Sequence, residues 1–402
     1  MRICFILHSS GKGGAERVNL ELIEGLAKKG IQCFAILPSY GPLLEELNKR
    51  DVPSKIISYK WWMREEGSPL WKRAGRLILN LIKTVTVVRQ VKKWKADVVY
   101  TNTITICVGA FTAKLLHLPH IWHIHEFGYE DHRLCFDLGE KMALGIMKQL
   151  SDVCIVGSKA VMEKYRKFFP DRKIKLIYYA VCVTNKSSCK ILKIKKQLQE
   201  ASGIKCMIVG SLHKGKYQED AIRAIGKLID KKIDVRLYIV GEGKLKYKQY
   251  LESLIIKGNL ENHIKFLGYI DNPFPVMQQA DILLMCSRKE AFGRVTVEGM
   301  KAGKPVIGAD SGGTKELIRD HYNGFLYTFG DYRELAEKVK YLCQHPDEAR
   351  QMGENGKQWA LEKFNIEHHT EKVLTILRQL IDKKNNKDSL AKETKEQNDI
   401  RY

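Results

Sequence analysis

Residues 1–17 read MRICFILHSSGKGGAER, an apolar run that passes directly into a glycine-rich loop. A helical pattern follows and ends near Gly30. This order predicts a β-strand, a tight turn and a helix, the first unit of a parallel βαβ fold. Because glycines allow close backbone approach and a helix start attracts negative charge, Gly13 and Gly14 are candidates for contact with a phosphate or a sugar. A purely structural turn is the alternative.

The same alternation of short apolar runs and longer helical patterns continues along the chain. It predicts strands at 3–8, 32–37, 98–101, 121–125 and 153–157, and again at 205–210, 235–240, 264–267, 282–285 and 306–309. The fold class is therefore α/β, with two Rossmann-like doubly wound domains, at 1–180 and 204–384, facing each other across a cleft. We expect a linker at 181–203, where no clear strand occurs, and a disordered polar tail at 385–402.

The composition indicates an anionic partner and a reducing compartment. Of the 402 residues 44% are hydrophobic, enough for two cores, and 68 basic against 46 acidic residues give a net charge of +22. The ten cysteines include no C-x-x-C pair, so we expect reduced thiols and neither a metal cluster nor disulfides. Without a signal-peptide pattern or a run of about 20 apolar residues, the protein is expected in the cytoplasm.

The sequence comes close to two phosphate-binding motifs but matches neither of them. The third glycine of G-x-G-x-x-G is replaced by Glu16, and the second strand ends in Pro38 without the ribose-binding acid of a dehydrogenase. Residues 210–217, GSLHKGKY, nearly spell a Walker A loop, but Tyr217 stands where a hydroxyl residue would hold magnesium. Lys216 could still neutralise charge on a leaving diphosphate. The alternative is a solvated basic turn.

The most specific stretch is residues 290–300, EAFGRVTVEGM, directly after a predicted strand. We expect Glu290 in the loop, Phe292 and Gly293 at the start of a helix, and Glu298 inside that helix. The first-turn amides would face an anion, and Glu298 could accept hydrogen bonds from the two hydroxyls of a ribose. A purely solvated helix face would carry more charge than the apolar run between the two carboxylates.

With these motifs the sequence resembles family 4 of the retaining glycosyltransferases, which have the two-domain GT-B fold. The E-x7-E from Glu290 to Glu298 matches the family's hallmark, and it is followed by KAGKPVI at 301–307, SGGTKELI at 311–318 and NGFL at 323–326. Upstream, the family positions are matched by Lys216, VGEG at 240–243 and FLG at 266–268. In the first domain the likeness is looser and rests on the glycine loop and on HIHE at 123–126.

The resemblance implies transfer from a nucleotide-sugar with retention of anomeric configuration, without a metal or any other cofactor. No D-x-D metal motif occurs in the sequence. By the family pattern, Lys216 and the amides near Phe292 and Gly293 would stabilise the departing diphosphate. Glu298 would hold the ribose, and Glu290 would contact the donor sugar.

The family pattern also assigns residues of the first domain. His125 would hydrogen-bond a sugar hydroxyl, and Gly13 and Gly14 would close against the diphosphate or the acceptor. A UDP-sugar is favoured over a GDP-sugar by family frequency alone. The acceptor expected for a basic cytoplasmic enzyme is a lipid-linked glycan of a growing surface polysaccharide.

One position departs from the family pattern. Members often carry an arginine where this chain has Ser211, so one cation that would bind the diphosphate is missing. Lys214, or Arg294 beside the acidic loop, is the hypothetical substitute. Arg294→Ala would contradict that role if donor affinity were unchanged.

A basic and aromatic segment lies between Lys60 and Lys95. It carries ten basic residues against two glutamates, together with four tryptophans and the apolar run 77–82. Lysine and tryptophan beside an apolar helical stripe suit the surface of an anionic membrane. The residues that we expect to contact membrane or acceptor are Trp61, Trp62, Trp71, Lys72 and Arg73. The alternative is a helix that packs on the sheet while its lysines are merely solvated.

Three other functions compete with sugar transfer. The net charge of +22 could mark a nucleic-acid-binding protein, but no RRM, KH or helix-turn-helix pattern accompanies it, and no nucleic acid is expected as a partner. A nucleotide-sugar epimerase could use the same two-domain frame. A pyridoxal-dependent phosphorylase would need a Schiff-base lysine and usually a much longer chain.

Overall fold

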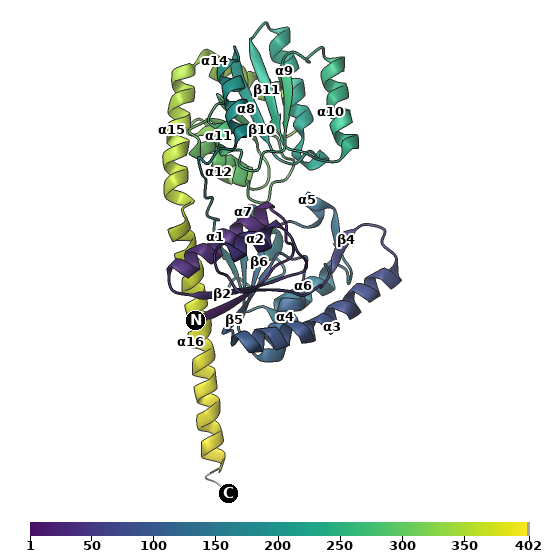
Figure 1. Cartoon of the computed structure of the whole chain (residues 1–402), viewed down its shortest axis with the longest axis vertical. Helices are drawn as coiled ribbons and strands as arrows, with labels where there is room; N and C mark the ends of the chain where they lie inside the picture. Colours follow the sequence, from purple (N-terminus) through teal and green to yellow (C-terminus); the bar gives the residue numbers. More distant parts are fainter. Residues whose placement is uncertain (400–402) are drawn as a thin grey trace. The chain divides into compact units, whose positions relative to one another are not determined.

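The computed structural model describes residues 1–399, apart from the side chains of residues 65, 132 and most residues from 387 onward. It divides into two compact units (Figure 1). The first contains Met1–Ala180 together with the chain from Ile366 onward, and the second contains Val181–Asn365. Each unit is an α/β fold built on one parallel sheet, as the alternation in the sequence predicts.

The first unit is built on a seven-stranded parallel sheet in the order β3-β2-β1-β5-β6-β8-β9. Its strands are β1 (Arg2–Ile6), β2 (Gln32–Leu37), β3 (Ser54–Ile56), β5 (Val98–Asn102), β6 (His120–Ile124), β8 (Val153–Val156) and β9 (Ile174–Leu176). Its helices are α1 (Gly14–Lys28), α2 (Pro42–Asn48), α3 (Leu70–Trp94), α4 (Val108–Leu116), α5 (Tyr129–His132), α6 (Glu140–Leu150), α7 (Lys159–Arg166) and α16 (Ile366–Asp399). A separate antiparallel pair joins β4 (Met63–Glu65) to β7 (Leu134–Phe136).

Alternate residues of β1 point to opposite faces of this sheet, and each face has its own apolar core. Ile3 and Phe5 belong to one core with residues of α1 and α16, whereas Cys4 and Ile6 belong to the other with residues of α3 and α4. Helix α16 packs against α1 so closely that a Cβ at Gly25 would lie 2.0 Å from Thr370 Oγ1. The last helix of the chain therefore completes the core of the first unit.

The second unit has a six-stranded parallel sheet in the order β12-β11-β10-β13-β14-β15. Its strands are β10 (Ile204–Val209), β11 (Val235–Val240), β12 (Ile264–Gly268), β13 (Ile282–Met285), β14 (Val306–Ala309) and β15 (Gly324–Tyr327). Its helices are α8 (Cys189–Glu200), the 3-10 turn η1 (Lys214–Lys216), α9 (Gln218–Asp230), α10 (Leu245–Lys257), α11 (Phe274–Met277), α12 (Arg294–Lys301), α13 (Thr314–Leu317), α14 (Tyr332–Gln344) and α15 (Pro346–Lys363).

All ten predicted strands are present, four with the predicted bounds and six with ends displaced by one or two residues. The structure divides the chain differently from the prediction, however. Residues 181–203, predicted as a linker, contain α8 and group with the second unit. Residues 366–384 belong to the first unit instead of the second, and α16 continues through Asp399 where the sequence predicts a disordered tail. Residues 400–402 of that tail lie outside the described part.

Candidate active site

Six strands have the same order in the two sheets, with β9 added at one edge of the first, and in each sheet the direction of strand addition reverses once. The reversal lies between β1 and β5 in the first unit, and between β10 and β13 in the second. Ligands of open parallel sheets bind beyond the carboxyl ends of the strands at such a switch point. In both units, polar side chains meet at this position.

In the second unit, Lys216 and Glu290 form an ion pair at the switch point. Lys216 ends η1 in the loop after β10, and Glu290 lies in the loop after β13. Their Nζ and Oε2 atoms are 2.6 Å apart, and the two side chains keep 22% and 19% of their exposure. A backbone hydrogen bond of 2.9 Å from Arg288 N to Gly215 O ties the two loops together. The structure thus joins two candidates that lie 74 positions apart in the sequence.

Helix α12 and the two residues before it carry most of the other predicted donor residues of the second unit. Its N-cap is Gly293, at φ 99°, and the helix begins at Arg294, two residues later than predicted. Phe292 is buried and packs on Phe364, with ring centroids 5.8 Å apart, so its side chain anchors the loop. Glu298 is buried within the helix. Because first-turn amides have no partner inside their helix, this end of α12 suits an anion.

The glycine loop after β14 holds the Glu290 loop in place. Gly313 N donates a 2.7 Å hydrogen bond to Glu290 O. Gly312 has φ +55°, and a Cβ there would lie 2.4 Å from Glu290 O and 2.8 Å from Glu290 N. Only a residue without a side chain allows the two backbones to approach this closely.

The position where family members often carry arginine is exposed. Ser211 O accepts a 3.0 Å hydrogen bond from Gln218 Nε2, and the Ser211 side chain faces solvent. Of the two candidate substitutes, Lys214 is exposed and Arg294 is half-buried as the first residue of α12. Arg294 therefore sits at the helix end that suits an anion, and its role as the missing cation stays a prediction.

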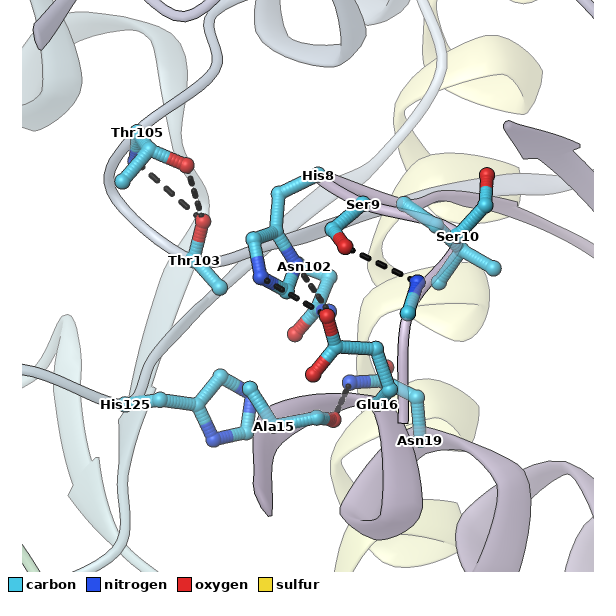
Figure 2. Close-up of polar contacts among 12 residues, drawn as sticks. His8, Ser9, Ser10, Ala15, Glu16, Asn19, Asn102, Thr103, Thr105 and His125 are labelled. Atoms are coloured by element: carbon cyan, nitrogen blue, oxygen red, sulfur yellow. Dashed lines mark hydrogen bonds and ion pairs between the residues drawn. The ribbon is translucent and has the colours of Figure 1, made fainter. Parts of the chain in front are cut away.

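In the first unit, Asn102, His8 and Glu16 form a chain of contacts at the switch point (Figure 2). Asn102 Nδ2 lies 3.1 Å from His8 Nδ1, and His8 Nε2 lies 3.4 Å from Glu16 Oε1. With the Asn102 amide donating to Nδ1, the neutral imidazole carries its proton on Nε2, facing the carboxylate. Sequence reasoning assigned no site role to these three residues. A signal was available in the polar residues that follow the predicted strands: His8 lies two residues after β1, and Asn102 is the last residue of the neighbouring β5.

The glycines of the first loop make room for this carboxylate. Gly13 is the N-cap of α1, and Gly14 is the first residue of the helix. A Cβ at Gly13 would lie 2.5 Å from Glu16 Oε2. The structure therefore gives Gly13 a packing role, while contact of Gly13 and Gly14 with a ligand stays a prediction.

His125 directly follows β6 and stacks within an aromatic cluster of the first unit. Its ring centroid lies 4.0 Å from that of His123 and 5.1 Å from that of Tyr179. The neighbouring Glu126 is buried and accepts hydrogen bonds from His125 N, at 3.0 Å, and from Ile104 N, at 2.9 Å. Glu126 thus fixes the loop that carries His125.

The ionisation of Glu126 predicts a pH dependence of stability. Burial, reinforced by the charge of Asp131, raises the pKa of Glu126 to about 8. Between about pH 4.5 and 8 the folded state holds a proton that the unfolded chain has lost, so stability falls as pH rises. Glu126→Gln cannot ionise and should remove this contribution, which is at most about 1.4 kcal/mol per pH unit. Melting temperatures of wild type, Glu126→Gln and the exposed control Glu66→Gln across this range test it, and parallel profiles for all three would contradict it.

The structure corrects the predicted membrane segment. Trp62 is buried and donates to Ile104 O at 2.6 Å, and Arg73 Nε donates to Asp137 O at 2.9 Å, so both serve the fold. Trp61 is 38% exposed and donates to His8 O at 2.8 Å. Trp71 is 71% exposed, with the Lys72 ammonium 5.1 Å from its ring centroid. Of these five residues, only Trp71 and Lys72 therefore have mainly exposed side chains.

Within residues 1–399 we find no helix of sufficient length and apolarity to span a bilayer. In the same part of the chain, no cluster of three or more His, Cys, Asp or Glu side chains has the arrangement of a metal site.

Comparison with known proteins gives the class of this fold. The chain matches the family model of the group 1 glycosyl transferases over residues 190–359, and that of glycosyltransferase family 4 over residues 12–184. The solved structure of HepE from Anabaena in complex with UDP-glucose covers 94% of this chain and 100% of its own, with a TM-score of 0.77 and 25% identity. The two doubly wound units are those of a GT-B glycosyltransferase, as predicted.

Curated relatives agree with this class. An uncharacterized glycosyltransferase of Methanocaldococcus jannaschii is 30% identical over 294 residues, which are 69% of this chain and 73% of the relative. N-acetyl-alpha-D-glucosaminyl L-malate synthase of Bacillus anthracis is 27% identical over 243 residues, 60% of this chain and 63% of that protein. The chain belongs to the group 1 glycosyltransferases of family 4, which confirms the resemblance seen in its motifs.

Proposed function

We propose that this glycosyltransferase moves a hexose from a UDP-sugar to a lipid-linked glycan, with retention of anomeric configuration and without a metal. The reaction would take place on the inner face of the cell membrane, in the synthesis of a surface polysaccharide. The observation that carries the donor part is the Lys216–Glu290 pair, placed at the switch point of the second unit. The complex of HepE with UDP-glucose supports a UDP-sugar.

The chemistry follows from what each group can stabilise. As the bond between sugar and diphosphate breaks, negative charge grows on the leaving oxygen, and the Lys216 ammonium and the first turn of α12 would stabilise it. Glu298, a buried acceptor, would hold the ribose diol, and Glu290 would accept a hydrogen bond from a hydroxyl of the sugar. In the first unit, His125 would bind another sugar hydroxyl.

Donor binding is tested by thermal shift with UDP-, GDP-, ADP- and TDP-sugars. A ligand that binds only the folded state at 100 times its Kd stabilises it by about 2.7 kcal/mol. We expect a shift with UDP-sugars that Glu298→Ala abolishes and that the exposed control Glu261→Ala of the same unit retains. A shift of equal size in the Glu298→Ala variant would refute the ribose role, and the absence of any shift in folded protein would refute the donor site.

Acceptor and stereochemistry need a separate experiment. Incubation of the enzyme with radiolabelled UDP-sugar and membrane lipids should move the label into the organic phase, and NMR of the product should show the anomeric configuration of the donor. Label that stays water-soluble as an epimer of the donor would instead identify an epimerase. Inversion of the anomeric centre would contradict the retaining mechanism.

A further inference from the structure

Helix α3 of the first unit exposes a continuous apolar stripe. Residues seven apart lie about 20° apart around a helix, so Trp71, Ile78 and Val85 form a line about 21 Å long. Their exposed fractions are 71%, 57% and 48%. Leu81 and Ile82 widen the line on either side and are 56% and 59% exposed.

The amphipathic pattern of α3 is inverted at these positions relative to that of an ordinary surface helix. The inward side of the same turns is polar. Arg76 Nε and Nη2 donate to the Asp137 carboxylate at 2.8 and 2.5 Å, and the Asn80 side chain exchanges hydrogen bonds with the backbone of Lys60 at 2.8 and 3.0 Å. Thr84 Oγ1 is buried and donates to Asn80 O at 2.7 Å. Polar anchors thus hold the helix in place and turn its most apolar side chains toward solvent.

The charges of α3 define what this stripe would bind. The helix contains seven lysines and arginines and no aspartate or glutamate. The exposed line of the stripe continues beyond Val85 into Arg89, Lys92 and Lys93, all exposed. An apolar stripe that runs into a basic cluster matches the boundary between the acyl chains and the headgroups of an anionic bilayer.

We propose that the stripe of Trp71, Ile78, Leu81, Ile82 and Val85 lies in the surface of an anionic membrane. The basic residues at the end of α3 then contact the lipid phosphates. The proposal rests on the proposed function only for the lipid nature of the acceptor, because the surface itself is defined by exposure and charge. It keeps Trp71 and three residues of the apolar run 77–82, adds Val85, and omits Trp62 and Arg73, which the fold uses.

The test uses vesicles of phosphatidylcholine with about one third phosphatidylglycerol, and neutral vesicles of phosphatidylcholine alone. The full-length protein is expected to co-sediment with the anionic vesicles at low salt. The double variant Ile78→Glu/Ile82→Glu should bind at least about tenfold more weakly, because it puts two charges at the apolar boundary. The matched control Leu245→Glu/Ile256→Glu adds the same charges at exposed apolar positions of α10 and should bind like wild type.

Two results would overturn the proposal. One is equal vesicle binding by the stripe variant and wild type. The other is a loss of self-association in the stripe variant, measured by sedimentation velocity, with vesicle binding unchanged, because the stripe would then bind a second copy of the chain. Hydrolysis of UDP-sugar in the absence of vesicles reports the donor site in the same samples, so a failure of the membrane surface is distinguished from a failure of the proposed transfer.

Discussion

Lys216→Ala is expected to lower kcat for sugar transfer by about 10²- to 10³-fold, the usual cost of removing one preorganised group that stabilises developing charge. The Lys216 ammonium is held 2.6 Å from Glu290 and is only 22% exposed, so water cannot fully replace it. Its loss also leaves the half-buried Glu290 carboxylate without this cation, next to the proposed position of the diphosphate. Steady-state kinetics with a UDP-sugar and single-turnover measurements separate the chemical step from binding.

Matched variants identify the cause of this loss. Lys216→Arg keeps the charge and should retain more activity than Lys216→Ala, whereas Lys257→Ala, at an exposed position at the end of α10, should leave kcat within about twofold. In the double variant Lys216→Ala/Glu290→Gln, the two effects should not add, because the side chains are in direct contact. Additive losses would show that Lys216 and Glu290 act independently. An unchanged kcat in Lys216→Ala would show that the lysine takes no part in the reaction.

The sequence predicts the two sheets well because each long strand is a buried apolar run between turn signals. Strands such as β1, β11 and β13 are buried along most of their length and leave a clear pattern. Of the five strands that it misses, β3, β4, β7 and β9 have only three residues each, too few to establish a period, and β15 has four. The edge strands β3, β9 and β15 therefore become visible only in three dimensions.

The assignment of α16 to the first unit could not be predicted from the local sequence pattern, for a different reason. The helix buries Val373, Leu374 and Leu377, a pattern that any amphipathic helix could show. The neighbouring sequence does not indicate which core these residues join. The contact with Gly25 joins residues about 345 positions apart. Proximity along the chain favours the second unit, and that is the assignment the prediction made.

The sequence identified the chemical groups of the candidate site, but it did not show which of them lie in contact. The E-x7-E spacing and the lysine of the loop after β10 selected Glu290, Glu298 and Lys216 from sequence alone. That Lys216 and Glu290 touch follows from the strand order, in which β10 and β13 are neighbours although two strands separate them in the chain.

Gly312→Ala is expected to reduce activity by about 100-fold while the second unit stays folded, since a displacement of about 1 Å in a catalytic group can cost that much. The added Cβ would meet Glu290 O at 2.4 Å and Glu290 N at 2.8 Å, and both are backbone atoms that cannot rotate away. Relief requires the two loops to separate, which weakens the 2.7 Å bond from Gly313 N to Glu290 O and moves the carboxylate away from Lys216.

The left-handed φ of Gly312 also disfavours alanine, by about 1 kcal/mol, and this strain has to be separated from the contact. Gly330→Ala provides the control, because Gly330 has φ +84° in the same unit and no atom within 4 Å of an added Cβ. Both variants should lose a similar small amount of stability from backbone strain, and only Gly312→Ala should lose donor binding in the thermal-shift assay. Equal activity in the two variants would mean that the loop after β14 does not position Glu290, and the donor site would then depend on the loops after β10 and β13 alone.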